Sequence, residues 1–68
     1  NVDNFKIYDK DKYVGVVIST YNKTGQTLIQ VKMSEKTILV PLVDELIKEI
    51  NYEEQKIQMI LPEGLLDI

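Results

Sequence analysis

The sequence predicts an all-β domain, folded as a small six-stranded antiparallel barrel with one short helical turn and a short C-terminal tail. Five or six segments with strand character recur at spacings of roughly 8 to 12 residues, and most are joined by tight turns. A chain of 68 residues forms one domain, and a chain this short buries only about 60% of the surface that its unfolded form exposes. Closing the sheet into a barrel also removes exposed sheet edges.

The first two predicted strands occupy residues 5–8 and 13–22. Residues 5–8 alternate apolar and polar side chains, and the polar residues 9–12 form the turn after them. Residues 13–22 are rich in β-branched and aromatic side chains. Strict alternation places Val17 on one face and, on the other, Val14, Val16 and Ile18. Gly15 is a position where a strongly curved sheet could bend or bulge.

The next two predicted strands occupy residues 27–33 and 37–42. A turn at 22–26 precedes the first, and its Gly25 is free to take a positive φ. Alternation then places on one face Ile29, Val31 and Met33, and in the following strand Ile38, Val40 and Leu42. Pro41 cannot donate a hydrogen bond to a neighbouring strand, which indicates an edge strand or a strand end.

The stretch after residue 42 is open to two interpretations. Its apolar residues fall at helical spacing, and acidic residues suit a first helical turn, so a two-turn helix is possible locally. Residues 56–61, however, have strand character and need a neighbour to pair with. We therefore favour a single turn at residues 43–46, followed by a hairpin of residues 47–52 with 56–61. Pro62 ends the last strand, and a tail follows.

Composition argues against several kinds of chemistry. The chain has no cysteine and no histidine, which removes disulfides, the usual zinc sites and imidazole acid–base catalysis. It has no phosphate-binding loop and no nucleophile motif. Asp9 and Asp11 resemble the start of a calcium loop, but the glycine and distal glutamate that complete such a loop are missing. We expect no catalytic residue, no metal, no cofactor and no small-molecule substrate.

Charge divides the chain into two unlike halves. Residues 1–34 carry five lysines against three aspartates, a net charge of +2, whereas residues 35–68 carry three lysines against eight carboxylates, a net charge of −5. The acidic half favours a basic protein partner and disfavours direct nucleic-acid binding. The alternative that these are only solvated surface charges stays open. No apolar run approaches a membrane span, and we expect a cytoplasmic location without membrane contact.

The strongest motif is V-P-L-V-D-E-L-I-K-E-I at residues 40–50 together with P-E-G-L-L-D-I at residues 62–68. With K-I-Q-M-I-L between them and F-K-I-Y-D-K-D-K-Y-V-G-V-V upstream, nearly the whole chain resembles the C-terminal PRC-barrel domain of the RimM family of bacterial ribosome maturation factors. Two departures stand out. The family's aromatic opening segment would lie before Asn1, and Thr27 occupies a position that is often acidic in the family.

The resemblance implies a non-enzymatic assembly factor that helps to mature the head of the small ribosomal subunit and supports processing of its rRNA. It also implies that residues 1–68 are an isolated C-terminal domain, whose partners are the family's N-terminal barrel and the basic head protein numbered nineteen. We expect the partner-binding candidates to be Asp44, Glu45, Glu49, Leu65 and Leu66. Alternatives are a structural domain that packs against the N-terminal barrel, or an interaction module outside the ribosome.

Overall fold

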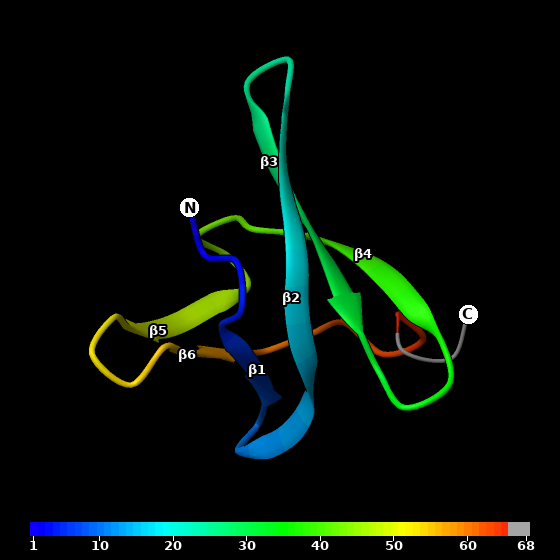
Figure 1. Cartoon of the computed structure of the whole chain (residues 1–68), viewed down its shortest axis with the longest axis vertical. Coiled ribbons are helices and arrows are strands. Elements are labelled where there is room, and N and C mark those ends of the chain that lie inside the picture. The colour runs from blue at the N-terminus through cyan, green and yellow to red at the C-terminus, as the bar shows by residue number, and fades with distance from the viewer. Residues whose placement is uncertain (66–68) are drawn as a thin grey trace.

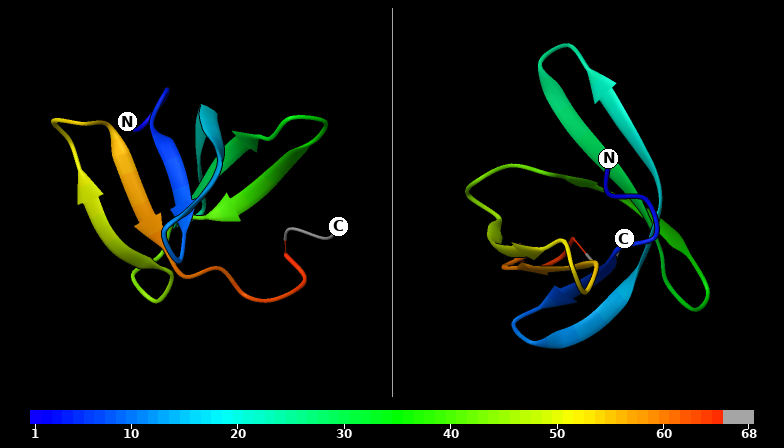
Figure 2. Two further views of the ribbon diagram at one scale, coloured as in Figure 1. Left: turned by 90° about the horizontal axis from the view of Figure 1, so that it is seen from below. Right: turned by 60° about the vertical axis from the view of Figure 1, so that its left-hand side comes forward.

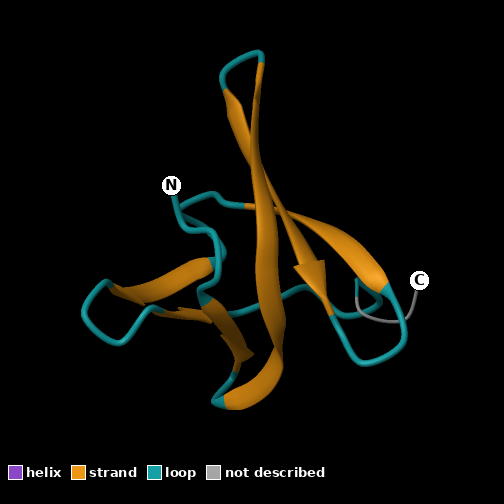
Figure 3. Cartoon of the chain, viewed as in Figure 1, coloured by secondary structure: helices purple, strands orange, loops and turns teal. Residues whose placement is uncertain are grey.

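The computed structural model describes residues 1–65, and every regular element in this range is a β-strand (Figures 1 and 3). The prediction of an all-β fold with six strands is confirmed. The strands are β1 (Lys6–Asp9), β2 (Lys12–Lys23), β3 (Gln26–Lys32), β4 (Thr37–Pro41), β5 (Ile47–Asn51) and β6 (Lys56–Met59). No helix within these residues is long and apolar enough to cross a membrane.

The six strands form one sheet in the order β4-β3-β2-β1-β6-β5. The sheet curls around its core, so that its two edge strands, β4 and β5, belong to opposite walls of the barrel (Figure 2). Strands β1 to β4 form an antiparallel meander, and β5 and β6 form an antiparallel hairpin. The hairpin joins the meander through β6 alone.

The prediction of an entirely antiparallel barrel is wrong at one seam, because β1 and β6 run parallel, with Ile7 opposite Ile57. The reason lies in the link from β4 to β5. Strands β1 to β4 alternate in direction, so β4 runs opposite to β1 in the sheet. Strand β5 also runs opposite to β1, because it is antiparallel to β6 and β6 is parallel to β1. Strands β4 and β5 therefore have the same direction in the sheet. The link does not reverse the chain as a hairpin turn would, so β6 arrives alongside β1 in the same direction.

The core is filled by alternate residues of the strands and by the N-terminal segment. Ile7, Ile29 and Ile57 have no exposed surface. The other buried apolar residues are Val2, Phe5, Val14, Val17, Val31, Ile38, Val40, Met59 and Leu61. The predicted inward faces of β3 and β4 are thereby confirmed, with Met33 and Leu42 packed at the margin of the cluster.

Strand β2 departs from strict alternation because its ladders shift register twice, between Ile7 and Tyr8 of the β1 pairing and between Val17 and Ser19 of the β3 pairing. As a result Val14 and Val17, which alternation places on opposite faces, are both buried, whereas Ile18 is 45% exposed. Gly15 lies beside the first shift. A Cβ atom built there would stand 2.3 Å from the Lys32 carbonyl oxygen, so this close approach requires glycine.

Two of the three connections within the meander are two-residue hairpin loops. Thr24 and Gly25 have φ values of 40° and 75° and link β2 to β3, a pattern typical of type I′ turns. Lys10 and Asp11 have φ values of 51° and 70° and link β1 to β2 in the same way. These primed turns match the right-handed twist of the strands that they join.

The link between β4 and β5 contains the predicted single helical turn. The Leu46 N–H donates to the Val43 carbonyl at 3.0 Å, and the Ile47 N–H donates to the same oxygen at 3.1 Å. Strand β5 begins at Ile47, so the two-turn helix left open by the sequence does not form. Pro41 is the last residue of the edge strand β4, as expected.

Candidate partner-binding site

The β5–β6 side of the barrel carries half of the acidic residues in the described range 1–65. Asp44 and Glu45 belong to the helical turn before β5, Glu49 lies on β5, and two further glutamates lie in the turn between β5 and β6. All five of these residues are exposed: Asp44, Glu45, Glu49, Glu53 and Glu54. This side of the molecule therefore offers carboxylates that are free to contact a cationic surface.

Glu49 forms part of a shallow depression of about 140 Å³ on the outer face of the β5–β6 hairpin. Its opposite partner in the ladder is Gln58, and the remaining lining residues are Asn51, Glu54 and Lys56. The Lys56 Nζ atom lies 3.4 Å from a Glu54 carboxylate oxygen and 5.7 Å from the centre of the Tyr8 ring. Glu49 thus gives the depression a negative charge, whereas the charge of Glu54 is partly neutralised by Lys56.

The depression brings Glu49 together with Glu54, but it includes neither Asp44 nor Glu45. The sequence analysis did not select Glu54 as a candidate and missed this proximity. The signal was present in the predicted hairpin, because pairing Asn51 with Lys56 folds a four-residue turn back beside the strand. The Glu54 N–H donates to the Asn51 Oδ1 atom at 2.9 Å, which fixes that turn.

Leu65 lies on the opposite wall of the barrel from these carboxylates. It is half-buried and packs against the core cluster, and with Thr37, Ile38 and Leu39 it lines a hollow of about 320 Å³ beside β4. Leu65 therefore contacts its own barrel and leaves part of its surface open. Leu66, the other predicted apolar contact, lies outside the described residues.

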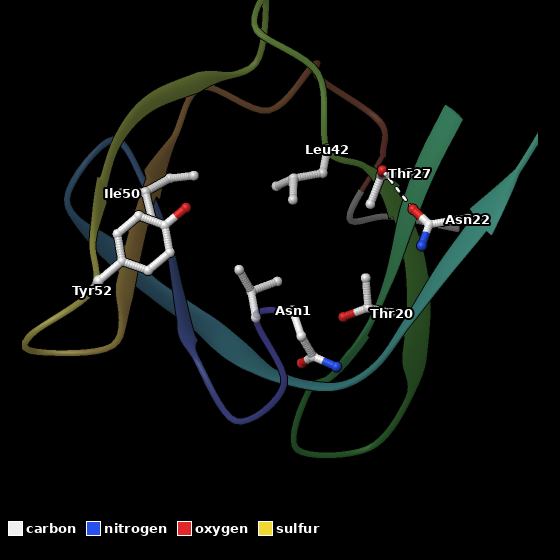
Figure 4. A pocket seen from close by; sticks show the side chains of 8 residues that line it. Asn1, Thr20, Asn22, Thr27, Leu42, Ile50 and Tyr52 are labelled. Atoms are coloured by element: carbon white, nitrogen blue, oxygen red, sulfur yellow. Dashed lines mark hydrogen bonds between the residues drawn. The ribbon is translucent and has the colours of Figure 1, made fainter. Parts of the chain in front are cut away.

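A second feature is a pocket of about 300 Å³ at the seam between β5 and the β2–β3 hairpin (Figure 4). Tyr52 and Ile50 approach it from the β5 side, and Thr20 and Thr27 approach it from the hairpin side (Figure 4). The full lining is Asn1, Val2, Thr20, Asn22, Thr27, Leu42, Ile50 and Tyr52. No charged side chain lines this pocket, so it suits a neutral group.

This pocket was not predicted, because its walls come from five separate segments of the chain and no local pattern marks them. The Thr27 hydroxyl donates to the Asn22 Oδ1 atom at 3.0 Å, so the hairpin side of the pocket carries a neutral hydrogen bond (Figure 4). Among residues 1–65, no group of three acidic side chains could hold a metal ion.

The curled six-stranded sheet with its parallel β1–β6 seam corresponds to a known class of small barrel. A family model described as the RimM PRC barrel domain matches residues 3–65. The chain therefore belongs to the RimM PRC-barrel family, as the sequence motifs indicated. Its fold is shared with the crystal structure of a RimM protein from Pseudomonas aeruginosa named for 16S ribosomal RNA processing, with a TM-score of 0.79 over 90% of this chain at 13% identity.

Relatives at the sequence level carry the same family name. The ribosome maturation factor RimM of Flavobacterium psychrophilum is 39% identical over 62 residues. The RimM of Bdellovibrio bacteriovorus is 38% identical over 69 residues, covering 98% of this chain. The chain spans only 36% and 39% of the lengths of these two relatives and 41% of the Pseudomonas aeruginosa protein.

Proposed function

We propose that this domain is a non-enzymatic protein-binding module of small-subunit assembly in the cytoplasm, whose acidic β5–β6 side contacts a basic ribosomal protein of the subunit head, the one numbered nineteen. Membership of the RimM family supports the ribosomal setting. Through that contact the domain would support maturation of the head and processing of small-subunit rRNA. Residues 1–68 would correspond to the C-terminal domain of a longer maturation factor.

The observation that carries this proposal is the exposure of Asp44, Glu45 and Glu49 on consecutive pieces of one wall, the helical turn and strand β5. Exposed carboxylates gathered on one side steer a cationic partner toward that side and fix its orientation. The adjoining neutral pocket with Tyr52 at its rim offers an anchor for an apolar or polar side chain of the same partner. A polar rim around such an anchor is the usual anatomy of a protein interface.

Binding of the 68-residue chain to the purified ribosomal protein tests the proposal, measured by calorimetry at low and high salt. Glu49→Lys and the double variant Asp44→Lys/Glu45→Lys should each weaken binding by about threefold to tenfold at low salt. The matched control is Glu35→Lys, because Glu35 is an exposed residue of the β3–β4 turn on another side of the barrel. Its affinity should stay within about twofold of the unchanged chain.

Equal weakening by Glu35→Lys and Glu49→Lys would show that net charge alone governs binding, and the acidic side would lose its assigned role. Absence of binding at either salt concentration would contradict a self-sufficient site. Two-dimensional NMR of the labelled chain would complement the calorimetry. The amide chemical shifts should change around β5 and the pocket and stay constant at the β3–β4 turn, which carries the control residue Glu35.

Leu65 favours a second candidate function, in which the domain packs against the N-terminal barrel of a longer protein. Its half-buried side chain and the exposed Leu39, 53% accessible, flank the hollow beside β4. Deleting residues 62–68 separates the two functions. Loss of thermal stability with unchanged partner affinity would identify the tail as a part of the fold, and loss of affinity at unchanged stability would identify it as a contact surface.

A further inference from the structure

The outer face of the β2–β3 hairpin has an unusual charge distribution. The chain has eleven acidic residues, yet none lies between Asp11 and Glu35, a range that contains Lys12, Lys23 and Lys32. Strands β2 and β3 therefore carry positive charge only, in a protein whose net charge is −3. Figure 1 shows that this hairpin also projects beyond the body of the barrel, which leaves its faces accessible.

The ladder register shows which side chains share the outer face. Ile29 and Val31 of β3 point into the core and are fully buried, so the alternate residues of β3 point outward. Residues opposite each other in a ladder lie on the same face of the sheet. Four pairs of β2 and β3 therefore lie on the outer face: Lys23 with Gln26, Tyr21 with Leu28, Ser19 with Gln30, and Val16 with Lys32. Six residues of β3 separate the two ends of this strip, a distance of about 20 Å.

Tyr21 lies in the middle of the strip with its ring held in place and accessible. Its hydroxyl donates to the Gln30 Oε1 atom at 3.0 Å, and the Ser19 hydroxyl donates to the same oxygen at 2.9 Å. Tyr21 is 46% exposed. Both bonds use the Gln30 oxygen as acceptor, and the amide group of glutamine also carries two N–H donors.

A hollow lies where the strip ends at Lys32. It measures about 290 Å³ and is lined by Lys32, Tyr13 and Val16 together with Val14, Gly15, Met33 and Ser34. Tyr13 is 58% exposed, and its ring packs edge-on against Tyr8 with the centroids 5.6 Å apart. An aromatic ring and an ammonium group thus border an open space of the size of a small planar group.

We propose that this outer face, named here the hairpin strip (Ser19, Tyr21, Lys23, Gln30 and Lys32), binds single-stranded RNA. The Tyr21 ring stacks on a base, the Gln30 amide donates to a base carbonyl, and Lys23 and Lys32 contact phosphates. Aromatic rings on a sheet surface flanked by lysines are the usual platform for single strands. The sequence-based expectation of no nucleic-acid contact rested largely on the acidic half of the chain, and five carboxylates of that half lie on the β5–β6 side, away from the hairpin strip.

The proposal does not depend on the protein partner, because the two surfaces share no residue. A basic protein would meet Asp44, Glu45 and Glu49, whereas RNA would meet the hairpin strip. The alternative occupant of a lysine-bearing face is an acidic protein surface. The exposed rings of Tyr21 and Tyr13 favour a nucleic acid over an acidic protein surface, because carboxylates gain nothing from stacking.

Fluorescence anisotropy of the 68-residue chain with a labelled single-stranded RNA of mixed sequence tests the proposal. Tyr21→Leu should weaken binding by about 5- to 150-fold, the range that base–aromatic stacking gives. Lys32→Gln should weaken it and also reduce the slope of log K against log salt by about 0.7, the value for one phosphate contact on a single strand. All these side chains lie on the surface, and circular dichroism checks that each variant is folded.

The acidic side supplies matched controls. Tyr52→Leu removes a tyrosine that is 67% exposed and sits beside Glu53 and Glu54, and Lys48→Gln removes an exposed lysine of β5. Both should bind RNA within about twofold of the unchanged chain. The proposal is overturned if no RNA binding occurs at about 50 mM salt, if the controls weaken binding as much as the strip variants, or if polyglutamate displaces the RNA from the unchanged chain.

Discussion

The two halves of the sheet differ in shape and in charge. Strands β2, β3 and β4 form a meander with a long projecting hairpin and carry no acidic residue at all. Strands β5 and β6 with their flanking turns are short and carry five exposed carboxylates. Because each half is continuous in sequence, a charge division along the chain becomes a division in space. The net charge of the whole chain therefore describes the surface charge of neither half.

Within residues 1–65, strand β1 is hydrogen-bonded to both halves, through an antiparallel ladder with β2 and a parallel one with β6. The halves nevertheless share one core, since Ile7, Ile29 and Ile57 belong to a single buried cluster. The difference between the halves thus lies at the surface, while their interiors act together. The following changes test this view, from the largest expected effect to the smallest.

Ile57→Ala should have the largest effect, a loss of about 2–5 kcal/mol in the free energy of unfolding. Ile57 has no exposed surface and lies opposite Ile7 on β1 and Ile50 on β5, so the cavity cannot collapse easily. A domain of this size has only about 3–10 kcal/mol in total. Urea unfolding followed by NMR of residues in β3 and β6 should show one common transition.

Val31→Ala is the matched change in the other half, at a fully buried valine of β3. It should also shift the transitions of both halves together. Separate unfolding transitions for β3 and β6 in either variant would mean that the halves unfold independently. That result would contradict the view that one shared core couples them.

Gly15→Ala should cost about 1–3 kcal/mol, the range for overpacking in a well-packed interior. The new methyl would collide with the backbone oxygen of Lys32 on β3, at the point where β2 also pairs with Ile7 of β1. Gly25→Ala is the control, because nothing lies within 4 Å of a Cβ there, although φ is +75°. A left-handed backbone conformation alone costs about 1 kcal/mol for a residue with a side chain. The melting temperature of Gly15→Ala should therefore be lower than that of Gly25→Ala.

Asp9→Ala should have a smaller effect, about 1–2 kcal/mol. A carboxylate oxygen of Asp9 accepts from the Leu61 N–H at 3.0 Å and so ties β1 to the residues after β6. Lys56→Gln is its comparison, since the Lys56–Glu54 pair joins two side chains that are 39% and 62% exposed. A surface pair of this kind contributes about 0–1 kcal/mol. If urea unfolding shows a larger loss of unfolding free energy for Lys56→Gln than for Asp9→Ala, this ranking is contradicted.

Local patterns predicted the strands of β3 and β4 because alternation there is unbroken, from Ile29 to Val40. They failed in β2, where two register shifts allow both Val14 and Val17 to be buried, although alternation placed them on opposite faces. A bulge depends on the partner strand, so one strand's sequence does not reveal it. The parallel β1–β6 pairing escaped for the same reason, because it joins Ile7 to Ile57 across 50 positions.

The candidate site was predictable to a lesser degree. Counting charges found the acidic half, and Asp44, Glu45 and Glu49 are exposed there. Sequence could not show that Glu49 shares a depression with Glu54 rather than with Asp44, because that depends on how the hairpin folds back. Nor could it show the neutral pocket, whose residues run from Asn1 to Tyr52.

The parallel seam between β1 and β6 also sets an order on synthesis. The meander can form from neighbouring segments as the chain emerges, but β1 keeps one open edge until the chain has been made through Met59. During that interval Ile7 lacks its cover from Ile57, and an uncovered edge invites pairing with other chains. A barrel sealed by its last strand is therefore most exposed to aggregation just before it is complete.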